Sequence, residues 1–184
     1  MTDNKQLDTR NRRNNLFLVG LSATGKTTIG RIIADMLDYD FVDSDAEIEE
    51  RTGVQVSWIF ELEGESKFRD RESDILKEIT RRSRIVLATG GGVVLREENR
   101  ALLRSRGWVA CLTSSTEELA RRAGNVQTRP LIQQGDSIEQ TFLEMERVRR
   151  PLYESVSDIS FKTFGEDKRT LARDIVAWYR KISS

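Results

Sequence analysis

Residues 16–28 read LFLVGLSATGKTT, and this stretch decides the fold. The four apolar residues 16–19 predict a buried strand, and residues 26–37 predict a helix because their isoleucines and leucines recur on one face. Between them, GLSATGKT fits the phosphate-loop pattern G-x-x-x-x-G-K-[ST] at every fixed position. A strand, this loop and a helix in succession are the context that the pattern requires. The segment therefore predicts a site for the phosphates of a nucleoside triphosphate.

Such a loop binds phosphate mainly through its backbone. Its N–H groups point inward and meet the positive end of the helix dipole, so they form a nest for an anion. Lys26 is expected to reach the β- and γ-phosphates, and the Thr27 hydroxyl is expected to bind Mg²⁺. The residues of this segment that we predict to bind the nucleotide are Gly20, Ser22, Ala23, Thr24, Gly25, Lys26, Thr27 and Thr28.

Short apolar runs alternate with longer amphipathic segments along the rest of the chain. The runs predict strands at 16–19, 40–42, 85–88, 108–112 and 158–161. The amphipathic segments predict helices at 26–37, 46–51, 57–60, 66–82, 97–105, 116–123 (with Ser115 as N-cap), 138–149 and 168–181. This alternation predicts a three-layer α/β domain, in which helices cover both faces of a five-stranded parallel sheet.

The composition is typical of one soluble domain. The chain has 184 residues, and its 30 Lys and Arg balance its 30 Asp and Glu. A balanced charge disfavours a nucleic-acid binder, and the lack of an apolar run of about 18 residues disfavours a membrane span. We therefore expect a cytoplasmic protein with no nucleic-acid or membrane partner. We also expect the polar residues 1–14 to be a disordered tail and residues 15–184 to form a single domain.

Two scarce residue types narrow the chemistry. Histidine is absent, so a Ser-His-Asp triad and an imidazole metal site are excluded, and a general base has to be a carboxylate or, less readily, Lys, Tyr or Cys. The single cysteine, Cys111, excludes an intrachain disulfide and a cysteine zinc site. Its apolar neighbours in residues 108–112 predict a buried structural thiol.

Two carboxylates follow the second predicted strand directly, in Asp43-Ser44-Asp45. Ligands of an open parallel sheet bind beyond the carboxyl ends of its strands, which here is beside the phosphate loop. One of the two acids could hold Mg²⁺ while the other accepts a hydroxyl proton. The alternative is that Asp45 only caps the helix that follows.

Arg69 and Glu72 lie three residues apart on one face of a predicted helix. They form either an ordinary ion pair or a site in which Arg69 grips a substrate carboxylate while Glu72 orients it. Residues Gly90, Gly91 and Gly92 follow the third strand, where three glycines let the backbone lie against a ligand.

The two prolines each follow an arginine or an arginine pair. Arg129-Pro130 lies in residues 124–135, a long connection with no regular pattern, which predicts a mobile lid or else a variable surface loop. Arg149-Arg150-Pro151 lies at the predicted end of a helix, where a proline is expected to stop it.

Together these residues resemble the shikimate kinase family of phosphate-loop kinases. The family pattern consists of the phosphate loop, D-x-D, F-R-x-x-E, G-G-G, a lid R-P-L and R-x-P-L-Y. The chain carries them in that order as residues 20–27, Asp43 to Asp45, Phe68 to Glu72, Gly90 to Gly92, Arg129 to Leu131 and Arg149 to Tyr153. The resemblance covers about residues 15–180.

The resemblance implies ATP-dependent phosphorylation of the 3-hydroxyl of shikimate, on the route to chorismate and aromatic amino acids. It implies Asp45 as the base, with catalytic help from Lys26 and Arg129. It implies that residues 45–82 form the acceptor-binding helices and that the protein is a monomer. The implied acceptor-binding residues are Asp45, Arg69, Glu72, Gly90, Gly91, Gly92 and Arg149. Thr27 and Asp43 would hold Mg²⁺, Arg129 would contact the transferring phosphoryl group of ATP, and Arg122, or Arg121 beside it, would stack on adenine.

Ala23 departs from the family pattern, which has a further glycine there. We expect an active enzyme with a somewhat altered loop. Two alternatives stay open: a related small-molecule kinase such as a gluconate kinase, and a catalytically silent nucleotide-binding module. The second would require the loss of Lys26, Asp45 or Arg129, and all three are present.

Overall fold

The computed structural model describes residues 14–123, 137–165 and 167–183. The predicted lid at 124–135, with Arg129, lies outside the described residues, as do residues 1–13 of the predicted tail.

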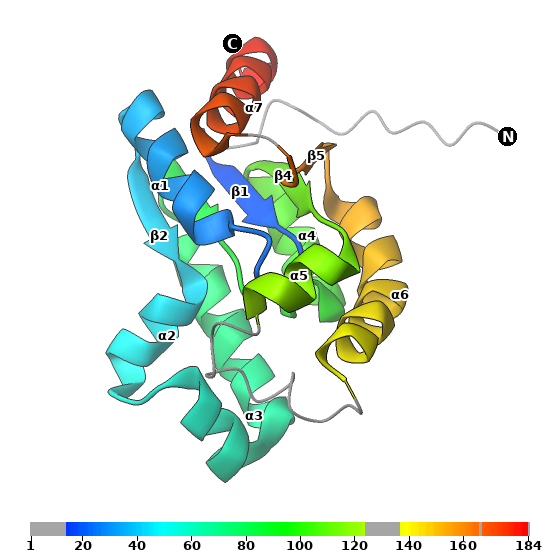
Figure 1. Cartoon of the computed structure of the whole chain (residues 1–184). Helices are drawn as coiled ribbons and strands as arrows, with labels where there is room; N and C mark the ends of the chain where they lie inside the picture. The colour runs from blue at the N-terminus through cyan, green and yellow to red at the C-terminus, as the bar shows by residue number, and fades with distance from the viewer. Residues whose placement is uncertain (1–13, 124–136, 166, 184) are drawn as a thin grey trace, which may run out of the picture.

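Five parallel strands form one sheet, as predicted, and their order is β2-β3-β1-β4-β5 (Figure 1). The strands are β1 (Leu16–Val19), β2 (Asp40–Asp43), β3 (Ile85–Ala88), β4 (Trp108–Thr113) and β5 (Ile159–Lys162). In the centre, Leu16 of β1 is in register with Val86 on one side and Trp108 on the other. Because β1 is central, the loop at its carboxyl end opens in the middle of one sheet edge.

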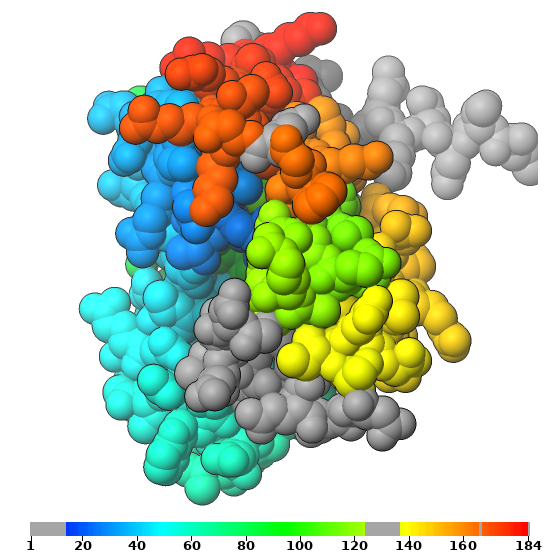
Figure 2. Space-filling view, in the orientation of Figure 1, coloured from blue at the N-terminus to red at the C-terminus, as the bar shows by residue number. Residues whose placement is uncertain are grey.

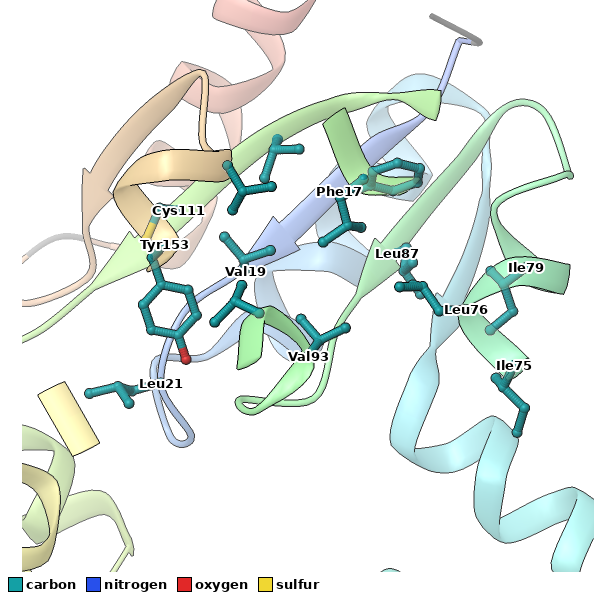
Figure 3. Close-up of a cluster of buried hydrophobic side chains, with 14 of the residues drawn as sticks. Phe17, Val19, Leu21, Ile75, Leu76, Ile79, Leu87, Val93, Cys111 and Tyr153 are labelled. Carbon is teal, nitrogen blue, oxygen red and sulfur yellow. The ribbon is translucent and has the colours of Figure 1, made fainter. Parts of the chain in front are cut away.

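Helices cover both faces of this sheet, which gives the three layers that the sequence predicts (Figure 1). Leu16 and Leu18 face α1 and α7, while Phe17 and Val19 face the opposite core, which α3 and α6 help to build. Figure 3 shows part of this second core. The helices are α1 (Lys26–Leu37), α2 (Ser44–Thr52), α3 (Val56–Ile79), the short 3₁₀ helix η2 (Val93–Leu95), α4 (Glu97–Arg106), α5 (Thr116–Ala123), α6 (Ile138–Val156) and α7 (Lys168–Ser183).

The core side chains of β1 are fully buried on both sides of the sheet. This explains why the strand reads as a continuous apolar run rather than an alternating one. Cys111 of β4 is buried, as predicted, in the core that contains Phe17 and Val19. Burial raises the pKa of its thiol to about 11. Within the described residues, no helix is long and apolar enough to cross a membrane.

Two helices, α3 and α6, differ from the prediction by more than two residues. Residues 57–60 and 66–82 were expected to be separate helices, but α3 joins them across a kink at Gly64, whose φ of 83° is left-handed, and it ends at Ile79. The end predicted at Arg149 is also wrong, because α6 continues through Pro151 to Val156. A proline in a helix leaves the carbonyl four residues earlier without its usual donor. Here that residue is Arg147, which is exposed, while the burial of Tyr153 and Val156 favours continuation.

Candidate active site

The phosphate loop connects β1 to α1 at the middle of the sheet edge. The Lys26 ammonium lies buried in it and donates to the carbonyl oxygens of Gly20 and Leu21, both at 2.8 Å. A lysine held this way is already positioned inside the nest of the loop. It can exchange carbonyl oxygens for phosphate oxygens without leaving the loop.

The two sides of the loop face different spaces. Six of the predicted residues, Ser22, Ala23, Gly25, Lys26, Thr27 and Thr28, line a cavity of about 670 Å³. The other two, Gly20 and Thr24, line a separate cavity of about 200 Å³ between the loop, β4 and α6. The Thr24 hydroxyl donates to the Leu21 carbonyl at 2.8 Å, so this side chain stabilises the turn of the loop.

Asp43 connects the loop to α2. Its Oδ2 accepts a hydrogen bond of 2.7 Å from the Thr27 hydroxyl, while its Oδ1 accepts from the backbone N–H groups of Asp45 and Ala46. Asp43 is therefore the N-cap of α2, and the alternative in which Asp45 is the cap is wrong. Asp45 lies in the first turn of α2 and lines the larger cavity.

Thr27 and Asp43 are a suitable pair for Mg²⁺. While the Thr27 hydroxyl hydrogen points to Asp43, its lone pairs stay available to a cation, and the carboxylate is a hard oxygen ligand. Among the described residues, no group of three or more His, Cys, Asp or Glu side chains could hold a metal. Mg²⁺ is commonly held by one or two protein oxygens together with substrate phosphates and water, and this pair fits that arrangement.

Arg69 is buried in α3 between two carboxylates. Its Nη1 donates to Glu72 Oε2 at 2.8 Å, and its Nη2 donates to Glu65 Oε1 at 3.0 Å. An exposed ion pair between residues three apart contributes only a few tenths of a kcal/mol. A buried pair is stable only when the two charged groups are well aligned and their remaining polar atoms are hydrogen-bonded. Burial raises the pKa of Glu72, and Arg69 and Arg149 act in the opposite direction.

At each of the three glycines after β3, a neighbouring side chain packs close to the position that a Cβ would take. A Cβ at Gly90 would lie 2.6 Å from Asp45 Oδ1 and 2.8 Å from Glu72 Oε1. A Cβ at Gly92 would lie 2.2 Å from the Arg69 guanidinium. At Gly91 it would lie 3.1 Å from Ser22 Oγ and 3.7 Å from Arg149 Nη1. The triplet is therefore the point where α2, α3, α6 and the phosphate loop meet.

Arg149 reaches the triplet from α6. It is buried, and its Nη1 donates to the Gly91 carbonyl at 3.3 Å. Arg150, the next residue, is exposed and pairs with Glu146 at 2.8 Å. Of this arginine pair, Arg149 is the one that lies at the site.

Glu118 of α5 holds two further arginines beside the larger cavity. Its carboxylate accepts from Arg121 at 2.7 and 2.8 Å and from Arg122 Nε at 2.6 Å, and the Arg121 hydrogen bonds are the main reason that its pKa is lowered to about 2. Arg122 also reaches the Thr163 carbonyl at 3.2 Å and the Ala23 carbonyl at 3.4 Å. The Arg122 side chain is 29% exposed and that of Arg121 is 70% exposed. In the space-filling view, α1 (blue), α2 (cyan) and α5 (green) lie on the same face of the molecule (Figure 2).

The chain is similar to known proteins over most of its length. The family model described as shikimate kinase matches residues 22–180. The chain belongs to the shikimate kinase family.

Individual relatives cover nearly the whole chain. A shikimate kinase of Haemophilus influenzae is 45% identical over 89% of this chain and 91% of the relative. One from Pasteurella multocida is 44% identical over 89% of this chain and 94% of the relative. The solved structure of shikimate kinase from Acinetobacter baumannii in complex with shikimate superposes with a TM-score of 0.88, at 40% identity, covering 93% of this chain and 95% of the other.

The family pattern named most of the residues that meet at the glycine triplet, but not the carboxylates that hold their arginines in place. Glu65 lies four residues before Arg69, and Glu118 lies four before Arg122, so both have the helical spacing of an ion pair. That spacing is a signal, but it is shared by several exposed pairs such as Arg51 with Glu47. Lys168, at the start of α7, also lines the larger cavity and was not predicted.

Ala23 has a φ of 65°, the left-handed region that favours glycine. Replacing it with glycine removes about 1–2 kcal/mol of steric cost and loses about 0.4–1 kcal/mol because the unfolded chain becomes freer. We therefore predict that Ala23→Gly raises the free energy of unfolding by about 0.5–1 kcal/mol in urea titrations.

The matched control is Ala120→Gly, in the middle of α5. The same change there lowers the free energy of unfolding by about 0.5–1 kcal/mol, because a helical alanine gains nothing from the extra freedom. Equal destabilisation by both variants would contradict the strain at Ala23.

Proposed function

We propose that this protein transfers the γ-phosphoryl group of ATP to the 3-hydroxyl of shikimate, giving shikimate 3-phosphate and ADP for the synthesis of chorismate and aromatic amino acids. The observation that carries this proposal is the convergence on Gly90 to Gly92, which bring Asp45, Arg69 and Arg149 next to Ser22 of the phosphate loop. The complex of the Acinetobacter baumannii relative with shikimate supports the choice of acceptor.

The acceptor binds on the α3 and α6 side of the triplet in this proposal. Arg69 and Arg149 bind the shikimate carboxylate. Hydrogen bonds to Glu72 and Glu65 fix the orientation of the Arg69 guanidinium. Glu72 Oε1 is buried and has no hydrogen-bond partner among the described residues. Because a buried carboxylate oxygen requires a donor, we infer that it accepts a hydroxyl hydrogen of the acceptor.

Asp45 accepts the proton of the 3-hydroxyl as the oxygen attacks the γ-phosphorus, and the bond to the ADP oxygen breaks. Asp45 suits this step because it lies at the carboxyl end of β2, lines the nucleotide cavity and is not needed as the cap of α2. Lys26 moves from carbonyl to phosphate oxygens and neutralises charge on the β- and γ-phosphates.

Two further groups complete the proposal. Mg²⁺, when bound, neutralises phosphate charge, and Thr27 with Asp43 would hold it. Arg129 is proposed to contact the transferring phosphoryl group, with residues 124–135 as a lid, on the strength of the family pattern alone. A monomeric, cytoplasmic protein with one catalytic domain stays a prediction.

A measurement of acceptor preference tests the proposal. A coupled ADP-release assay compares shikimate, gluconate and nucleoside monophosphates, and we expect kcat/KM for shikimate to exceed the others by about 10²-fold or more. A preference for gluconate would favour the related kinase. A gluconokinase of Sinorhizobium meliloti shares the fold with a TM-score of 0.57 at 20% identity. ADP release with none of these acceptors would favour a silent binding module.

Asp45→Asn tests the base. It keeps the shape of the side chain but removes the proton acceptor, so kcat for shikimate falls by roughly 10²–10⁴-fold while KM for ATP stays within a few-fold. Asp40→Asn, an exposed change at the start of β2, is the control and leaves kcat unchanged. Turnover of the Asp45 variant within threefold of wild type would exclude Asp45 as the base.

Arg122 rather than Arg121 is proposed to stack on adenine, because Arg122 is tied to the phosphate loop through Ala23 and to the end of β5 through Thr163. A guanidinium over an aromatic ring contributes about 1–2 kcal/mol, so Arg122→Ala raises KM for ATP about tenfold. Arg121→Ala is the matched variant and changes KM for ATP less than threefold. A larger effect of Arg121→Ala would reverse the assignment.

A further inference from the structure

Tyr153 is a buried residue of the site to which the proposed reaction gives no role. It lies on α6 and is 5% exposed. Its hydroxyl donates a hydrogen bond to the Gly91 carbonyl oxygen. Arg149, one helical turn earlier, donates to the same oxygen at 3.3 Å. Two side chains of one helix therefore share a single carbonyl in the glycine triplet.

The Gly91 carbonyl belongs to the peptide group that also contains the Gly92 N–H. This group is planar, so a donor that fixes the direction of the carbonyl also fixes the direction of the N–H. On one side of this peptide Gly91 packs against Ser22 of the phosphate loop, and on the other Gly92 packs against the Arg69 guanidinium. Rotation of the peptide would therefore disturb both the phosphate loop at Ser22 and the Arg69 guanidinium.

We propose that Tyr153 is a positioning residue, whose hydroxyl holds the Gly91–Gly92 peptide in place and leaves Arg149 free to bind the acceptor carboxylate. The proposal rests on the proposed roles of Arg149 and the glycine triplet. A carbonyl oxygen has two lone pairs, and in this structure Tyr153 and Arg149 occupy them. When a carboxylate draws Arg149 away, the carbonyl still keeps the Tyr153 hydroxyl as its donor.

The chemistry of tyrosine suits this task. Burial raises the pKa of the Tyr153 hydroxyl, so it stays a neutral donor over the whole working pH range. Its ring packs in the core near Cys111, which fixes where the hydroxyl points (Figure 3). Without the hydroxyl, the carbonyl depends on Arg149 alone, and acceptor binding has to break that hydrogen bond.

Tyr153→Phe tests the proposal, because it removes one hydroxyl and keeps the ring that fills the core. We expect KM for shikimate to rise about tenfold, while kcat and KM for ATP stay within about twofold. The matched control is Tyr179→Phe, which deletes a hydroxyl that pairs with Tyr39 at 3.4 Å in the core on the opposite face of the sheet. Tyr179 is 1% exposed, and its variant leaves KM for shikimate unchanged.

A double-mutant cycle with Arg149→Lys adds a readout that a purely structural role would not move. Both side chains act on one carbonyl, so their effects are coupled. We therefore expect the increase in KM for shikimate in the double variant to be smaller than the product of the increases in the two single variants. An unchanged KM for shikimate in Tyr153→Phe, an equal rise in KM for ATP, or fully multiplicative effects would each overturn the proposal. Wild-type turnover of shikimate, measured in the same assay, decides the proposed function separately.

Discussion

The absence of a Cβ at three consecutive residues, Gly90 to Gly92, is the constraint on which the rest of the site depends. A Cβ at Gly92 would lie 2.2 Å from the Arg69 guanidinium, and a Cβ at Gly90 would lie 2.6 Å from Asp45 Oδ1. With either Cβ present, the neighbouring side chain would have to move. The Arg69 guanidinium has little room to shift, because it is buried and two carboxylates hold it by hydrogen bonds. Close approach of the backbone at β3 thus allows three helices and the phosphate loop to share one small volume.

The architecture was predictable because its signals are local. Each strand reads as an apolar run between amphipathic segments, and the phosphate-loop pattern follows the first of them. The strand order, which places β1 in the centre of the sheet, was not predicted. The errors arose where tertiary packing overrides a local rule. Pro151 is a helix breaker by itself, yet α6 continues because Tyr153 and Val156 are buried beyond it. Gly64 kinks α3 without separating it into two helices.

The sequence pattern named residues that the structure brings together at the glycine triplet, but it did not predict the contacts between them. The sequence pattern indicated Arg69, Arg149 and the glycine triplet, yet it left open whether Asp45 is a helix cap, and it named Arg122 with Arg121 as the alternative. Both questions depend on which atom lies within about 3 Å of which other atom, and such distances follow from packing between segments far apart in the chain. Arg122 differs from its neighbour through Thr163, which is 41 residues away.

The partners of Arg69, Arg122 and Arg149 differ in charge. Arg69 is buried between the carboxylates of Glu72 and Glu65, and because hydrogen bonds between charged groups contribute about 1.5–3 kcal/mol, its guanidinium is firmly fixed. Arg122 is held by Glu118. Arg149 is paired with a neutral carbonyl within the described residues, and such a bond contributes only about 0.5–1.5 kcal/mol. If a carboxylate binds as proposed, it displaces the carbonyl partner of Arg149 at lower cost than it would displace Glu72 from Arg69. In the proposed reaction, Arg69 keeps its direction, whereas Arg149 turns to the acceptor because Tyr153 remains hydrogen-bonded to the carbonyl that Arg149 leaves.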